Sequence, residues 1–127
     1  MTTPRASGVT RSRDRGAVDV SIEMLFGLVL VLAVMFALFE ATVYWHSRNV
    51  FDDAAAEGAR VAAAYDGTCA TGIAAARHEL RQRASSWAAG AVVTCTDGPL
   101  VTVRIAGPTA GATGVRASVS EQAPRER

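Results

Sequence analysis

The chain has 127 residues, 13 basic and 12 acidic side chains, and a net charge of +1, and all of its basic residues are arginines. Nucleic-acid binding needs a clustered basic face with interleaved aromatics, which this near-neutral chain lacks, so nucleic acid is excluded as a partner. The length allows one small domain beside a single membrane-length apolar run.

Residues 1–18 are polar, carry four arginines and lack apolar periodicity, which predicts a disordered leader. Beyond the apolar run, Arg48 is accompanied by Asp52 and Asp53, so the excess of positive charge lies on the amino-terminal side. The positive-inside rule then predicts a cytoplasmic amino terminus and an extracytoplasmic carboxyl-terminal part.

The apolar run between Met24 and Trp45 approaches the roughly 20 residues that a transmembrane helix needs, and we assign the span to residues 19–45. A signal peptide is the alternative, but its apolar core is only about 7 to 15 residues long. Because a charge inside a bilayer is costly, Glu40 either extends to the interface or pairs with another group. Tyr44 and Trp45 suit the headgroup level, so membrane lipid is an expected partner.

Helix-permissive residues continue beyond the membrane, so residues 46–66 are predicted to extend the helix to Tyr65, over a total of about 70 Å. Gly67 then ends the helix in a left-handed conformation. Small residues in the segment 54–64 allow close approach of another helix, although a solvent-exposed rod would favour alanine equally. The candidate packing residues are Ala54, Ala55, Glu57, Gly58, Ala59 and Arg60.

Residues 67–120 are predicted to form a small α+β head, followed by a flexible tail over 121–127. Apolar residues recur every three or four positions from Gly72 to Ala89, which predicts a second helix.

Two β-like runs, Val92–Thr96 and Leu100–Ile105, flank a turn at residues 97–99 and predict a hairpin. A third alternating run begins near Val115, after a loop over 106–114. The predicted fold class is therefore α+β, with an amino-terminal transmembrane helix, a second helix and a three-stranded antiparallel sheet.

The two cysteines, Cys69 and Cys95, both fall in the predicted outer segment. A small core is marginal without a staple, and an oxidising compartment permits one. A disulfide across this loop would contribute roughly 3.5 kcal/mol in the chain-entropy model. Two unpaired buried thiols are the alternative, whereas two cysteines without nearby histidines do not complete a metal site.

The remaining polar residues do not form a recognisable catalytic set. His46 and His78 are far apart, and no nucleophile elbow, zinc-binding helix or phosphate loop occurs in the sequence. We therefore predict a protein that is not an enzyme and needs no cofactor. A titratable cluster around His78, Glu79 and Asp97 in a cleft would argue for an enzyme instead.

Several spaced elements together resemble the TadE-like proteins, small pseudopilins of the tight-adherence (Flp-type) pilus and secretion machinery. Those proteins typically show an Arg-Gly element, a glutamate opening the apolar helix, a second glutamate near its end, an arginine soon after, and an A-x-x-E-G-A-R-like segment. The matching elements here are Arg15 with Gly16, Glu23, Glu40, Arg48 and the residues 54–64.

The resemblance implies a membrane-anchored structural component or assembly factor of such a pilus, at the cell membrane or on surface pili. Its partners would be other pilin-like or pilus-assembly proteins and the prepilin peptidase. Glu23 resembles the glutamate that follows the peptidase cleavage point, which places Val18 and Asp19 at the cleaved bond. A membrane-tethered binding module unrelated to pili is the alternative function.

Overall fold

The computed structural model describes residues 2–4 and 13–127, with side chains described from Asp19 onward in the first helix. Residue contacts divide the chain into two units, Met1–Leu38 and Phe39–Arg127, here called the N-terminal unit and the C-terminal unit. Residues 5–12 of the predicted leader lie outside the described residues. The leader prediction is wrong for residues 13–18, because helix α1 (Arg13–Ala63) begins at Arg13.

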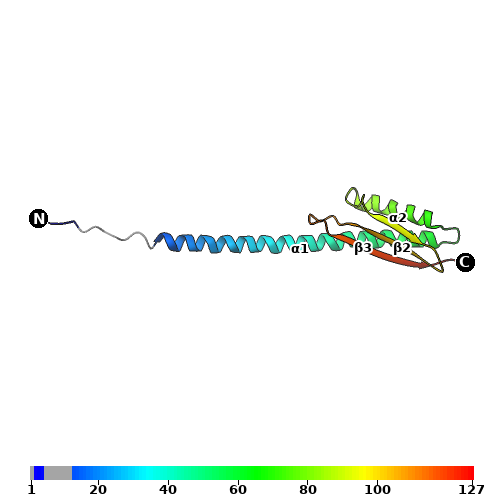
Figure 1. Ribbon diagram of the computed structural model, residues 1–127, viewed down its shortest axis with the longest axis horizontal. Coiled ribbons are helices and arrows are strands. Elements are labelled where there is room, and N and C mark those ends of the chain that lie inside the picture. Colours follow the sequence, from blue (N-terminus) through cyan, green and yellow to red (C-terminus); the bar gives the residue numbers. More distant parts are fainter. Residues whose placement is uncertain (1, 5–12) are drawn as a thin grey trace. The chain divides into compact units, whose positions relative to one another are not determined.

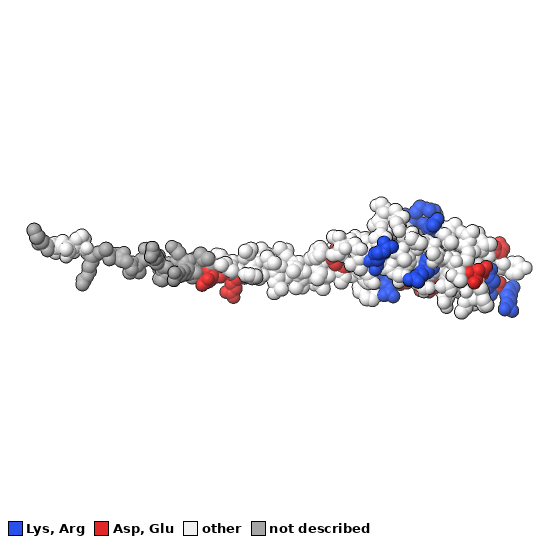
Figure 2. All heavy atoms as spheres, in the orientation of Figure 1, with Lys and Arg blue, Asp and Glu red and all other residues white. Residues whose placement is uncertain are grey.

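Helix α1 is 51 residues long (Figure 1). Its first part forms the helix of the N-terminal unit, and its second part belongs to the C-terminal unit. In the N-terminal unit its leucine, valine, phenylalanine and methionine side chains are exposed, for example Met24 at 74% and Phe26 at 71%. In Figure 2 an uncharged stretch follows the two acidic side chains near the start of the described helix. The large apolar side chains described in this unit are therefore exposed rather than packed into a core.

The carboxyl end of α1 requires a glycine at residue 67, but for a reason other than the predicted one. Gly67 does not have a positive φ. A Cβ at this position would lie 2.1 Å from the carbonyl oxygen of Val61, and the Gly67 amide donates to the Ala64 carbonyl at 2.8 Å. Close approach of the chain to the end of its own helix therefore excludes any side chain here.

Helix α2 (Cys69–Ala84) begins with a capping box, in which the Thr68 side chain accepts from the Thr71 amide and the Thr71 side chain accepts from the Thr68 amide. This cap explains the start at Cys69, three residues before the predicted one. The helix ends at Ala84 rather than Ala89, because Ser85 leaves the helical region at φ 51° and ψ −133°.

The sheet contains β1 (Val92–Thr96), β2 (Leu100–Pro108) and β3 (Arg116–Pro124), paired antiparallel in the order β1-β2-β3. The α+β class with two helices and a three-stranded antiparallel sheet is thus confirmed.

Both longer strands exceed their predicted bounds. The flexible tail predicted from residue 121 is wrong as far as Pro124, because β3 pairs with β2 up to the partner Leu100. Beyond the strand, the Arg125 amide donates to the Pro99 carbonyl at 3.0 Å and the Glu126 amide donates to the Ala63 carbonyl at 2.8 Å.

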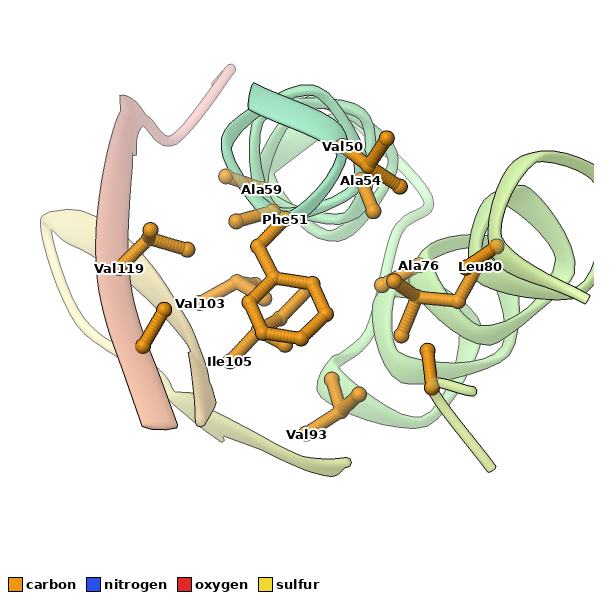
Figure 3. Close-up of a cluster of buried hydrophobic side chains, with 14 residues drawn as sticks. Val50, Phe51, Ala54, Ala59, Ala76, Leu80, Val93, Val103, Ile105 and Val119 are labelled. Atoms are coloured by element: carbon orange, nitrogen blue, oxygen red, sulfur yellow. The ribbon is translucent and has the colours of Figure 1, made fainter. Parts of the chain in front are cut away.

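The core of the C-terminal unit lies between the sheet and both helices. Figure 3 shows Phe51 of α1 pointing between strand residues and α2 residues, including Ile105 and Leu80. Phe51 is fully buried, and its ring lies 5.6 Å from the ring of Trp87. Alternation along each strand produces this inner face, where Val93, Ile105 and Val119 stand opposite one another.

Candidate functional site

The predicted processing residues lie in the N-terminal unit. Val18 is in α1, although its side chain lies outside the described part of the chain. Asp19 and Glu23 are exposed, and because they are four residues apart they lie on the same face of the helix. These two carboxylates therefore precede the uncharged stretch as one small acidic patch.

The exposed apolar side chains of α1 extend from Val20 to Phe39. At 1.5 Å per residue this segment of about 20 residues covers about 30 Å, the thickness of a bilayer's hydrocarbon core. The helix that contains it is long and apolar enough to be a candidate membrane span by length and composition.

Glu40 follows this apolar segment directly and is bonded to the loop that joins β2 to β3. This β2–β3 loop comprises residues 109–115. The Ala112 amide donates to Glu40 Oε1 at 2.9 Å, and the Thr113 hydroxyl donates to Glu40 Oε2 at 2.8 Å. A Cβ at Gly111 would lie 2.5 Å from Glu40 Oε2, so the loop approaches the carboxylate closely at a residue without a side chain. Glu40 therefore has hydrogen-bond partners within the chain, and its predicted position at the membrane interface stays a prediction.

Ser47, two turns later on α1, provides a second attachment for the same loop. Its fully buried hydroxyl donates to the Val43 carbonyl at 2.8 Å and accepts from the Ala110 amide at 3.1 Å. The loop closes on itself, because the amide and hydroxyl of Thr109 donate to the Val115 carbonyl at 2.9 and 2.8 Å. Two side chains of α1 thus determine where the loop lies.

The aromatic pair lies beside this attachment. Trp45 is 58% exposed, whereas Tyr44 is half-buried against the core. Their rings meet edge to face with centroids 6.1 Å apart, and the Arg48 guanidinium lies 5.8 Å from the centre of the Trp45 ring. An exposed indole with a neighbouring cation is a typical arrangement for the headgroup level of a membrane.

The predicted packing segment is largely unavailable to other proteins. Ala54, Ala55, Gly58 and Ala59 are buried, the three alanines in the core of the C-terminal unit and Gly58 against α2 of the same chain. A Cβ on Gly58 would lie 2.9 Å from the Ala76 Cβ and from the Gly72 carbonyl oxygen. The interpretation of these four residues as a free surface is therefore corrected: close packing occurs, but within the C-terminal unit.

Glu57 and Arg60 are the more accessible members of the segment. The Arg60 guanidinium donates to both Glu57 carboxylate oxygens, at 2.9 and 2.7 Å. This hydrogen bond and the arginine's charge hold the pKa of Glu57 below its ordinary value. Because the pair is exposed, it adds only modestly to stability and leaves two fixed charges on the outer face of α1.

A disulfide joins Cys69, at the start of α2, to Cys95 of β1, with the two Cα atoms 5.5 Å apart. Close to it, Arg125 forms an ion pair with Asp97 and donates to the Gly67 carbonyl at 3.3 Å. The Arg125 guanidinium and the Gly98 amide hold the pKa of Asp97 below its ordinary value. Covalent and ionic links therefore close the end of the C-terminal unit where α1 stops.

The two histidines and the acidic residues of the described chain do not form a metal site. His78 is exposed and contacts Gln82 at 3.0 Å, one turn further along α2. Within residues 2–4 and 13–127, no group of three or more His, Cys, Asp or Glu side chains is placed to hold a metal ion.

Comparison with known proteins identifies the amino-terminal part of this arrangement. Residues 20–60 match the family model described as TadE-like protein. This segment is TadE-like. The match confirms the resemblance predicted from the spacing of glutamates and the small-residue segment, and it associates the chain with a family of structural pilus components.

The TadE-like segment begins in the apolar run and ends at Arg60, so it includes Glu40, Ser47 and the buried alanines but none of the sheet. No curated protein matches the chain, and no solved structure matches it.

Sequence reasoning predicted a loop over 106–114 but missed its attachment to Glu40 and Ser47 of α1. The available signal was the absence of charge from the stretch 105–115.

Proposed function

We propose that this protein is a membrane-anchored, pseudopilin-like structural component or assembly factor of a tight-adherence type pilus. The observation that carries the proposal is the TadE-like match over residues 20–60, which covers both the candidate membrane span and the segment that joins it to the C-terminal unit. The amino terminus is cytoplasmic in this proposal, and the C-terminal unit lies outside the membrane.

Glu23 is the proposed assembly determinant. It is exposed near one end of the apolar run, where an uncompensated carboxylate is costly in a low dielectric. A cationic group of a neighbouring subunit, such as the new amino group produced by cleavage between Val18 and Asp19, would offset that cost. The prepilin peptidase is the partner that this cleavage requires.

The test of function is deletion and complementation in the native cell. We expect loss of the protein to abolish surface filaments in the sheared fraction, and wild-type protein to restore them. Glu23→Gln should fail to restore filaments, because it keeps the side-chain shape and removes the charge. Glu121→Gln is the matched control, since it makes the same substitution at a carboxylate of β3 that has no proposed part in processing, and it should restore them. Normal filaments in the deletion strain would contradict the proposal.

Mass spectrometry of the terminal peptides from membrane and sheared fractions tests processing separately. A new amino terminus at Asp19 in sheared material would support a processed subunit of the filament. An intact terminus confined to membranes would instead support an unprocessed assembly factor.

A further inference from the structure

We propose that the β2–β3 loop is a second membrane-contacting surface, which lies on the lipid headgroups beside the helix that anchors the chain. The inference rests on the membrane anchoring contained in the proposed function. It adds to that function a surface of the C-terminal unit that is more than 60 residues away from the candidate span in sequence.

The depth of the loop follows from its bonds to Glu40. Phe39 is 61% exposed and is the last large apolar side chain of the segment that begins at Val20. Glu40 comes next, so its carboxylate lies where the hydrocarbon core ends. Since the Ala112 amide and the Thr113 hydroxyl are 2.9 and 2.8 Å from that carboxylate, this part of the loop lies at the same level.

The composition of the loop suits an interfacial position. Residues 105–115 carry no charge, and the exposed members of the loop include Ala112, Thr113 and Val115. The amides of Thr109, Ala110 and Ala112 all donate within the C-terminal unit. Satisfied amides lower the cost of leaving bulk water, because an unpaired polar group is what makes such transfer expensive.

The surroundings of the loop supply the groups that contact headgroups. Trp45 and Tyr44 line a shallow hollow together with Thr109, Thr113 and Val115. The Arg48 guanidinium stands beside the Trp45 ring, and Arg116 follows the loop directly. Arg48 and Arg116 bring positive charge to this surface, and a basic side chain at an anionic surface favours binding by about 1 kcal/mol. Glu40 and Asp52 are the nearest acidic residues to Arg48 along α1.

The opposite end of the sheet differs from this loop in charge. There the β1–β2 turn contains Asp97, which pairs with Arg125, close to the disulfide. That end carries an ion pair beside the exposed side chain of Leu100, whereas the residues of the β2–β3 loop carry no charge. Lipid is therefore the occupant that the loop favours, and the charged turn provides a natural comparison in an experiment.

The experiment places p-benzoylphenylalanine, a photo-crosslinking residue, in the full chain reconstituted into phosphatidylcholine and phosphatidylglycerol vesicles. Ala112 is the test position, and Thr96, exposed next to the charged turn, is the matched control. Val31, 58% exposed in the apolar segment, reports anchoring itself. After irradiation, lipid adducts are measured by mass spectrometry. We expect adducts at positions 31 and 112 and none at 96.

Each other outcome has a defined meaning. Adducts at 31 but not at 112, or equal adducts at 112 and 96, would overturn the loop proposal and leave anchoring intact. Adducts at 112 to a second protein chain alone would overturn it in favour of a subunit contact. An absence of adducts at 31 would overturn anchoring and the loop proposal together.

Two further variants make the result independent of any disturbance at Ala112. A probe at Val115, which is 49% exposed, leaves the bonds to Glu40 unaltered and should also capture lipid. Glu40→Gln replaces one acceptor oxygen by a donor, so the loop loses a bond. The adduct at 112 should then fall, whereas the adduct at 31 should stay the same.

Discussion

Helix α1 exposes leucine, phenylalanine and methionine in the N-terminal unit, whereas in the C-terminal unit the same helix buries mainly alanine and glycine around Val50 and Phe51. In water the larger side chains would gain far more from burial than the smaller ones. The reversal is explained if the N-terminal unit faces lipid, which solvates large apolar side chains, and only the C-terminal unit has to form a core. The side chains in the two parts of the helix therefore suit two different surroundings, lipid in the first part and a protein core in the second.

Of the substitutions considered, Phe51→Ala should lower the free energy of unfolding most, and only the C-terminal unit should be destabilised. Phe51 is fully buried and contacts Trp87. Its truncation leaves a cavity, so the free energy of unfolding should fall by about 3–5 kcal/mol. Urea denaturation in detergent micelles, followed by tryptophan fluorescence, measures the change. Phe36→Ala, at a side chain that is 52% exposed in the N-terminal unit, is the matched control. A comparable loss of unfolding free energy in Phe36→Ala would contradict the proposed difference between the two units.

Replacing both cysteines by serine should have a similar but slightly smaller effect. Cys69 and Cys95 are 26 residues apart in sequence. In the chain-entropy model, opening such a loop lowers the free energy of unfolding by about 3.5 kcal/mol. Wild-type protein treated with dithiothreitol should unfold at the same urea concentration as the double variant, and both should remain in the membrane fraction. A double variant as stable as oxidised wild type would contradict this prediction.

The same substitution, glycine to alanine, should be tolerated in one unit and damaging in the other. Gly58→Ala inserts a Cβ 2.9 Å from the Ala76 Cβ, which overpacks the α1–α2 contact. The cost of about 1–3 kcal/mol should exceed the roughly 1 kcal/mol that alanine's helix propensity supplies. Gly27→Ala meets none of the described atoms within 4 Å and should not lower stability. Urea denaturation of both variants measures the change in the free energy of unfolding. A Gly58→Ala protein more stable than wild type would contradict close packing at this position.

Acid should weaken the C-terminal unit through Asp97, the smallest of the predicted effects. The pKa of Asp97 is lowered in the folded chain by the Arg125 guanidinium and the Gly98 amide. Because the pKa of Asp97 is lower in the folded chain, its stabilising effect is fully present at a pH above the pKa of the unfolded chain. The effect is lost as the pH falls through the pKa of the folded chain. Asp97→Asn should therefore flatten the decline of stability below about pH 4.

The partner residue supplies the control for this pH dependence. Arg125→Gln should flatten the decline in part, and combining it with Asp97→Asn should add nothing further. Added salt should reduce the difference between wild type and variants, because the carboxylate is exposed. A pH profile of Asp97→Asn that coincides with the wild-type profile would contradict the assignment.

The elements that sequence predicted correctly depend on local pattern. A long uncharged run, helical spacing around Leu80 and alternation in Val101, Val103 and Ile105 are visible within a few residues of one another. The boundaries were less accurate, since the capping box at Thr68 and the turn at Ser85 moved both ends of α2. β3 extends to Pro124 because it pairs with β2 there, although its last residues alone resemble a polar tail.

The candidate site was less predictable, because its contacts are distant in sequence. Glu40 accepts from the Ala112 amide, which is 72 residues away in sequence. Ser47 accepts from the Ala110 amide, which is 63 residues away. Alanine carries little information on burial, so the interior position of Ala54, Ala55 and Ala59 did not follow from composition. The TadE-like elements identified the right segment of the helix, but only the structure shows what each residue contacts.

The long separation between Glu40 and Thr113 also has a consequence for the timing of synthesis. At 5–20 residues per second, a ribosome that has made Glu40 needs about 4–15 seconds to add Thr113, 73 positions later. Throughout this interval the carboxylate at the edge of the apolar run lacks the loop that later holds it. The bonds that attach the loop to Glu40 therefore form only several seconds after the residues of the apolar run have all been added.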